Sequence, residues 1–343
     1  MSLTPREAEV LNIIVESYIE NALPVGSRYV AKQSRLSLSP ASMRNIMADL
    51  SDKGYLMQPH TSAGRIPTDK GFRYYVDTMV RPDLLPENLQ QKIKEYLNQA
   101  GLEFSDILEH TSKLISSQSS LVGMAVAPQM HFVRWQQIDF VYIRSGVVMA
   151  ILIFQGGIVQ HKLLSVDEKV TADDLVKYRN YLNERFQGQT LYDVKQTVLR
   201  EMQEAQNQFN QLYSKALSLA RAACSDQEER QVYVDGTLNV WDQLDGKDLE
   251  SMRELLEFLE QRSELFELLD KISQREGLTI TFGKEVSGSK LGEWSIISSP
   301  YRVRGEPLGV IGTIGPIHMD YSRLVPMVDY IARMLSEILE SRF

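Results

Sequence analysis

Cysteine is almost missing from this sequence. Cys224 is the only one among 343 residues, which excludes an intramolecular disulfide framework and favours a reducing compartment. A single cysteine with no local signature is expected to be a small side chain on a helix rather than a nucleophile.

Long apolar runs are missing as well. The longest, VVMAILIF at Val147–Phe154, falls far short of the ~18–20 residues that a membrane span needs, and its β-branched residues favour a buried strand. The first residues, MSLTPREAEVLN, carry charges where an export signal needs an apolar block. We therefore expect a soluble, cytoplasmic protein with no membrane partner.

Patterns typical of enzymes are scarce. The sequence has no G-x-S-x-G motif, and the acidic pair Asp173/Asp174 falls at a predicted helix end, where solvated charge is the usual explanation. The histidines lie far apart along the chain, at positions 60, 110, 131, 161 and 318. His60 has no partner at metal-ligand spacing. The sequence predicts no enzyme, metal site or cofactor, although a site assembled from distant residues stays open.

Positive charge is in the minority, but it is concentrated. The net charge is −8, yet Ser27–Tyr75 holds eight Lys and Arg against three Asp and Glu. The rest of the chain holds 29 basic and 42 acidic residues. Such asymmetry indicates a phosphate-binding module on an acidic body.

Three helices are predicted in the first 54 residues. Thr4 caps the first, with Pro5 at its first position and Glu7 at capping-box spacing. A short second helix begins at Ser27. Ser39 caps the third, which ends at Gly54.

The third helix has one apolar and one polar face. The inward side chains are Met43, Ile46, Met47 and Leu50. The outward ones are Ala41, Ser42, Arg44, Asn45 and Ala48. Small residues allow close approach to DNA, Arg can bind guanine and Asn can bind adenine through paired hydrogen bonds in the major groove. An ordinary amphipathic helix explains the pattern equally well, so the helix alone does not decide.

The next segment favours DNA binding. GYLMQ and RIPT predict two short strands, with PHTSAG at the tip of the hairpin between them. Three helices followed by a basic hairpin make a winged helix-turn-helix. Its wing would lie along the phosphate backbone or in the minor groove. Thr68 caps a further helix that would present Lys70 and Arg73 to the duplex. The predicted DNA-binding residues are Arg28, Ser42, Arg44, Asn45, His60, Thr61, Ser62, Arg65, Lys70 and Arg73.

The same residues resemble a known family. The segment SMRNIMADLSDKGYLMQPHTSAGRIPTDKGFRYYVD, Ser42–Asp77, resembles the signature of the heat-inducible transcription repressor HrcA family. The match is dense over Arg28–Asp77 and weaker beyond Thr78. Pro40 departs from the small or hydroxyl residue expected there, which is harmless at the first helical position. The resemblance implies a repressor of chaperone operons that binds an inverted-repeat operator as a homodimer, loses activity on heating and depends on the GroE chaperonin.

The acidic body begins with two predicted helices, at 87–99 and 104–117. Several strands follow from Leu121 and others return late in the chain, before a helix at 321–339. A mostly antiparallel sheet flanked by helices resembles the GAF-like domain of this family. An alternative function is an effector-gated regulator with a small-molecule pocket near GVIGTIG and SGSKLG. The glycines of GVIGTIG are spaced three apart, which favours close strand packing over a phosphate-binding turn.

An entirely helical insertion is predicted between the two strand sets. From about Tyr192, apolar residues recur at alternating intervals of four and three, as in a coiled coil. The residues assigned to dimerisation are Val198, Met202, Phe209, Leu212 and Leu219. Packing of this seam against the same chain is the open alternative.

Together these patterns predict an α+β protein with an N-terminal winged helix-turn-helix, a GAF-like body and an inserted all-helical dimerisation domain. The expected division is a DNA-binding domain (1–80), a helical linker (81–118), the first part of the GAF-like domain (119–170), the insertion (171–231) and the second part of the GAF-like domain (232–343).

Overall fold

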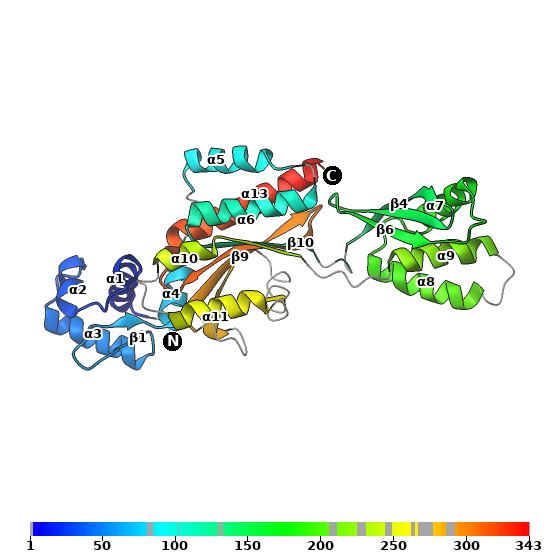
Figure 1. Ribbon diagram of the computed structural model, residues 1–343. Coiled ribbons are helices and arrows are strands. Elements are labelled where there is room, and N and C mark those ends of the chain that lie inside the picture. The colour runs from blue at the N-terminus through cyan, green and yellow to red at the C-terminus, as the bar shows by residue number, and fades with distance from the viewer. Residues whose placement is uncertain are drawn as a thin grey trace.

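The computed structural model is elongated and mixes helices with antiparallel sheets, as the α+β class requires (Figure 1). The first four helices lie at one end, a five-stranded sheet with its helices lies in the middle, and a three-stranded sheet with three helices lies at the other end (Figure 1). The structure describes residues 3–80, 85–101, 103–128, 130, 133–205, 211–224, 231–243, 249–261, 265–266, 277–285 and 292–342.

The N-terminal elements match the predicted ones. They are α1 (Pro5–Asn21), α2 (Ser27–Gln33), α3 (Pro40–Asp52), β1 (Leu56–Met57), β2 (Ile66–Pro67) and α4 (Asp69–Met79). Hydroxyl caps start three of the helices: Thr4 with a complete capping box, Ser39, and Thr68. Side chains from α1, α2 and α3 form the core between them, including Leu11, Ile14, Val30, Met43 and Leu50.

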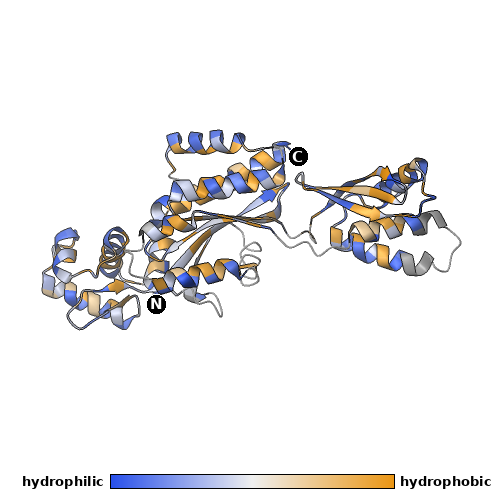
Figure 2. Cartoon of the chain, viewed as in Figure 1, coloured by the Kyte–Doolittle hydropathy of each residue, from blue (hydrophilic) through white to orange (hydrophobic). Residues whose placement is uncertain are grey.

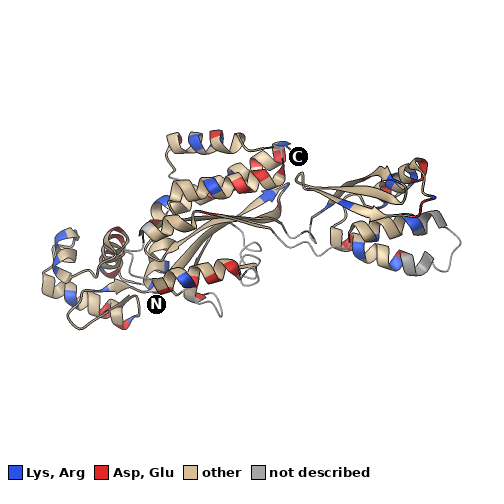
Figure 3. Cartoon of the chain, viewed as in Figure 1, with Lys and Arg blue, Asp and Glu red and all other residues tan. Residues whose placement is uncertain are grey.

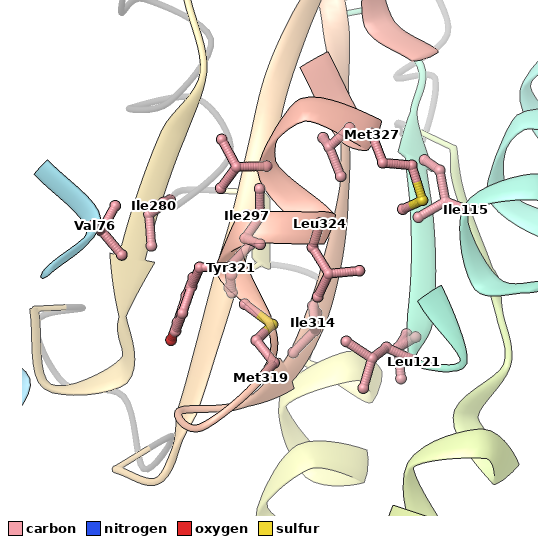
Figure 4. Close-up of a cluster of buried hydrophobic side chains, with 14 of the residues drawn as sticks. Val76, Ile115, Leu121, Ile280, Ile297, Ile314, Met319, Tyr321, Leu324 and Met327 are labelled. Carbon is pink, nitrogen blue, oxygen red and sulfur yellow. The ribbon is translucent and has the colours of Figure 1, made fainter. Parts of the chain in front are cut away.

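The central sheet is antiparallel throughout, with strand order β7-β3-β10-β9-β8. Its strands are β3 (Val122–Val126), β7 (Val232–Asp235), β8 (Thr279–Phe282), β9 (Trp294–Val303) and β10 (Glu306–Pro316). The helices α6 (Phe104–Ser119) and α13 (Tyr321–Arg342) lie along one face, and α5 (Glu87–Asn98) packs on these two helices (Figure 1). The helix α11 (Leu249–Glu260) lies on the other face, and α10 (Thr237–Gln243) lies beside β3. Figure 4 shows Tyr321, Leu324 and Met327 of α13 among Ile297, Ile314, Ile115 and Leu121.

The predicted linker is therefore only partly a linker. The helices at 87–98 and 104–119 form as expected, but α6 buries Ile107, Leu108, Leu114 and Ile115 against the central sheet. The apolar stripe of this helix thus belongs to the core of the body. The sequence pattern predicted the stripe but not the surface against which it packs.

The strands after β3 do not continue the central sheet. Instead, β4 (Trp135–Arg144), β5 (Val147–Phe154) and β6 (Val159–Ser165) form a second antiparallel sheet. This sheet shares a separate core with α7 (Ala172–Phe186), α8 (Leu191–Ala205) and α9 (Gln211–Ala223). The segment from residue 171 is helical in its described part, as expected, but β4–β6, which were assigned to the body, share its core. Alternating apolar residues reveal a strand but not the sheet that it joins.

The glycines of GVIGTIG fit close strand packing. A Cβ atom added at Gly309 would lie 2.2 Å from the carbonyl oxygen of Val126, and one at Gly312 would lie 2.3 Å from that of Ile297. Neighbouring strands occupy that space, which explains the spacing without a ligand pocket. Most of the second glycine-containing stretch, SGSKLG, lies outside the described residues.

No helix within the described ranges is long and apolar enough to cross a membrane.

Candidate nucleic-acid interface

The third helix presents a small polar surface next to its buried face. Arg44 and Asn45 are exposed, whereas Met43 and Met47 pack inward. Ser42 has a local role, since its N–H donates to the Ser39 hydroxyl at 3.2 Å and the two hydroxyls lie 3.1 Å apart. The exposed start of α3 can therefore offer a guanidinium and an amide to a groove of DNA.

The hairpin that follows is short and anchored to the helices. Met57 pairs with Ile66, and Leu56 pairs with Pro67. Arg65 also exchanges two backbone hydrogen bonds of 2.9 Å with Val25, in the connection between α1 and α2. A Cβ atom at Gly64 would lie 2.4 Å from the Val25 carbonyl oxygen, so glycine is needed at this close approach. The wing, residues 58–65, thus projects from a fixed base.

The tip of the wing is polar and accessible. His60, Thr61 and Ser62 are all exposed. Arg65 is half-buried, and its guanidinium donates to the side-chain oxygen of Gln58. The nitrogen of the same amide donates to the backbone oxygens of Thr61 and Ala63, each at 3.0 Å. Sequence reasoning did not single out Gln58, since an exposed glutamine in a loop carries no signal of its own.

Two predicted DNA contacts on α4 have partners within the chain. The Lys70 ammonium donates to the Lys53 carbonyl oxygen at 2.8 Å and lies 4.3 Å from the centre of the Tyr55 ring. The Lys70 side chain remains exposed to solvent, close to the C-terminal end of α3. Arg73 instead turns toward the body, where it meets Glu285 in the short turn η2 (Gly283–Glu285). Lys70 is thus accessible, and its contact with a duplex stays a prediction, whereas Arg73 faces the body in this arrangement.

Aromatic rings join this N-terminal module to the body. Phe72 of α4 lies 6.4 Å from Phe282 and 6.2 Å from Tyr321, and Tyr18 of α1 meets His318 edge-on at 6.0 Å. Burial at this junction lowers the pKa of His318, which favours the neutral form of its ring. Arg28, at the start of α2, lies away from this junction and is exposed.

Charge is distributed as the sequence predicts. Lys and Arg residues occur along α2 and in neighbouring parts of the N-terminal module, whereas the charged residues of α11 are mainly Glu (Figure 3). Among the described residues, no group of three or more His, Cys, Asp and Glu side chains could hold a metal ion. The exposed cations of the N-terminal module suit a phosphate-binding surface.

The residues assigned to dimerisation lie elsewhere in the fold than expected. The predicted long helix is two helices, α8 and α9, which pack on each other. Val198 and Leu219 are buried in the insertion's own core, at 2% and 7% exposure. Met202 and Leu212 belong to these helices, but their side chains are outside the described part, as is Phe209 altogether. Because Val198 and Leu219 are buried, the described part of this apolar repeat does not form an exposed interface. A repeat of four and three residues suits a helix pair within one chain as well as a pair between two chains.

A different apolar surface is open on the insertion. One face of its sheet packs on the helices, while the other face carries the alternate residues of each strand. Val141, Val159 and Leu163 there are 39%, 57% and 64% exposed, and the partly exposed Met149, Ile151 and Ile153 lie between them on β5. Figure 2 shows the apolar residues along these strands. We call these six residues the open sheet face. The continuous apolar run of β5 could have revealed this surface in the sequence, because a strand with apolar residues on both faces is expected to have both faces covered.

Comparison with known proteins yields one family. The family described as "HrcA protein C terminal domain" matches residues 105–325. A heat-inducible transcription repressor HrcA from Nitratidesulfovibrio vulgaris (strain DSM 19637 / Miyazaki F) is 41% identical over 100% of this chain and 97% of its own length. A protein of the same name from Geobacter sulfurreducens is 36% identical, with 98% of each chain covered.

One solved structure shares the fold over the whole length. It is a crystal structure described as that of a hypothetical protein, with a TM-score of 0.64, 24% identity and 100% of both chains covered.

Proposed function

The chain belongs to the HrcA family of heat-inducible transcription repressors, and we propose that residues 1–80 form the winged helix-turn-helix through which it binds its operator. The protein is a heat-shock transcription repressor, and thus a regulator rather than an enzyme. The observation that carries the proposal is the joint exposure of Arg44 and Asn45 on α3 beside a polar wing.

In this proposal α3 enters the major groove. Arg44 binds guanine O6 and N7, and Asn45 binds adenine N6 and N7, since each side chain matches the paired acceptors or donors of that base. Ser42 supports the start of the helix through its cap contacts with Ser39. Arg28 lies at the start of α2, where a helix that crosses the backbone meets phosphate.

The wing contacts the neighbouring backbone or minor groove. His60, Thr61 and Ser62 supply polar groups at the tip, and Arg65 and Lys70 supply positive charge at its base. Such contacts fix the orientation of the module and give the affinity its salt dependence, while α3 supplies the sequence preference.

We further propose a revised division of the remaining chain. The GAF-like body comprises α5, α6, β3 and the segment from residue 231 onward, and the insertion runs from about residue 130 to 224, with its own sheet and core. Two copies associate through the open sheet face of the insertion, because its six apolar side chains are partly or fully exposed to water, with Gln137, Asp139 and His161 beside them on the same face. The two-fold axis of the dimer then places two winged helix-turn-helix domains on the two half-sites of an inverted repeat.

The cellular part of the proposal follows from family membership. The repressor acts in the cytoplasm on chaperone operons, loses activity on heating, and is maintained by the GroE chaperonin. A folded state separated from the unfolded one by about 5–15 kcal/mol is sensitive to modest warming. Repression would then track the capacity of the cell to refold proteins.

Selection of bound duplexes from a random pool tests this proposal. The full-length chain is expected to enrich an inverted repeat with half-sites separated by whole helical turns. An enriched single half-site would contradict the dimeric part, and a pool without any common sequence would contradict the assignment of α3 as the reading helix.

A further inference from the structure

The wing is larger than its strands can support by themselves. Only two residue pairs join β1 to β2, and they close a loop of eight residues, 58–65. One member of the ladder is Pro67, which has no N–H to donate. Short two-stranded hairpins are marginally stable in water, so a loop of this length needs additional contacts to keep one conformation.

Backbone hydrogen bonds supply part of these contacts, between Val25 and Arg65 at the base and from the Ala63 N–H to the His60 carbonyl oxygen at the tip. The Gln58 side chain supplies the rest. Its nitrogen donates to the Thr61 and Ala63 carbonyl oxygens at 3.0 Å, which closes the tip on itself. Its oxygen accepts from the Arg65 guanidinium on the opposite side of the loop. The orientation of the amide is unambiguous, because a guanidinium only donates and a carbonyl oxygen only accepts. One side chain thus links both sides and the tip of the wing.

We propose that Gln58 is the positioning residue of the wing: it holds residues 60–63 in the shape that meets DNA and sets the direction of the Arg65 charge. This inference rests on the proposed DNA-binding function of the N-terminal module. Both N–H groups of the amide are already used within the wing, so Gln58 acts through Thr61, Ala63 and Arg65 rather than as a base-reading residue.

Position 58 requires a side chain that both donates and accepts hydrogen bonds. Glutamate would keep the partner of Arg65 but would place a carboxylate oxygen against two carbonyl oxygens. Methionine matches the length of glutamine and has no amide to donate or accept. The two substitutions therefore separate the role of the loop contacts from that of the Arg65 contact.

The first test needs no DNA. Hydrogen exchange is measured at the Ala63 amide, which donates to the His60 carbonyl oxygen at 2.9 Å within the wing. The proteins compared are the full-length wild type, Gln58→Met, Gln58→Glu and the control Gln99→Met, an exposed glutamine on the body. Since each hydrogen bond contributes modestly, Gln58→Met and Gln58→Glu should exchange about 5- to 20-fold faster at the wing. The control should not change it. Unchanged exchange in Gln58→Met would overturn the proposal.

The second test uses the duplex that the wild type selects. Gln58→Met should bind it about 3- to 10-fold more weakly, and the slope of log affinity against log salt should fall by less than one counterion, because the Arg65 cation is kept but is no longer held in one direction. Arg65→Met should lose affinity and also lower that slope by about one counterion. Weaker binding by Gln58→Met with unchanged exchange in the DNA-free protein would mean that Gln58 contacts DNA directly, which contradicts the proposal.

The two hypotheses fail differently. A wild type that binds no duplex refutes the DNA-binding function, while the exchange experiment still decides whether Gln58 orders the wing. A wild type that binds DNA, with Gln58→Met equal to it in both tests, refutes only the positioning role.

Discussion

Arg73 of α4 forms an ion pair with Glu285 of the body, with 2.5 Å between its guanidinium nitrogen and the carboxylate oxygen. The guanidinium also lies 4.7 Å from the centre of the Phe282 ring. A cation that faces a carboxylate in this way is directed away from phosphate, so we expect the body to compete with the operator for Arg73.

Neutralising Glu285 should release Arg73 to DNA. Glu285→Gln is expected to tighten operator binding about 2- to 5-fold and to steepen its salt dependence by about one counterion, since an exposed ion pair contributes only about 0–1 kcal/mol. The measurement is a titration over a range of salt concentrations. Glu337→Gln on α13 removes the same charge from an exposed site of the body and serves as the control. Equal effects of both variants would point to net charge rather than to Arg73.

Arg65 and Lys70 should contribute phosphate contacts. Replacing either with methionine is expected to weaken binding to all duplexes and to lower the salt slope by about one counterion each. An unchanged slope for Lys70→Met would place its ammonium in the structural role indicated by its contacts with Lys53 and Tyr55.

Arg44 and Asn45 should determine sequence preference. Arg44→Ala or Asn45→Ala is expected to cost about 1–3 kcal/mol on the selected operator and much less on random DNA, because the lost hydrogen bonds go to base edges. Competition assays with both duplexes measure this difference. Equal losses on the two would mean that the residues contact only the backbone.

The open sheet face should hold the dimer together. Leu163→Glu introduces a charge on β6 within the proposed interface and is expected to yield monomers in sedimentation experiments. Val176→Glu is the matched control, since Val176 is also exposed, at 45%, but lies on α7. An intact dimer in Leu163→Glu, or a monomer in the control, would locate the interface elsewhere.

The stability of the protein should fall in acid partly through Glu7. This carboxylate accepts from the Lys53 ammonium at 2.7 Å and from the Thr4 cap, and these bonds lower its pKa below the ordinary value of 4.5. A lowered folded-state pKa stabilises the fold above the unfolded value, and this contribution disappears as pH falls through the folded value. Chemical denaturation of Glu7→Gln should therefore show a smaller loss of stability between pH 5 and pH 3 than the wild type, by about 1 kcal/mol. Equal slopes in both would exclude the Lys53 contact as the cause.

Local patterns predicted the N-terminal module well, and nonlocal pairings limited the rest. The caps Thr4, Ser39 and Thr68 lie within a few residues of the groups that they bind, so sequence spacing identified all three. The partner of Arg73 is 212 residues away, and no spacing rule reaches Glu285. The same limit applies to β4–β6, because the alternation of apolar residues predicts a strand but not the sheet to which it belongs. It also applies to the apolar repeat of α8 and α9, because helices that pair within one chain show the same repeat as helices that pair between chains.

The central claim is that α3 and the wing together contact DNA, and directed cleavage from the wing tip tests it most directly. Cys224, the single native cysteine, is buried, so Ser62→Cys allows selective attachment of an iron chelate that cuts nearby DNA, with the exposed Ser117→Cys on α6 as the control. If α3 and the wing contact DNA, the chelate at position 62 cuts beside each half-site of the selected operator, and the chelate at position 117 makes no cut. Cuts from position 117 alone, or none from position 62 on an operator that remains bound, would contradict this claim.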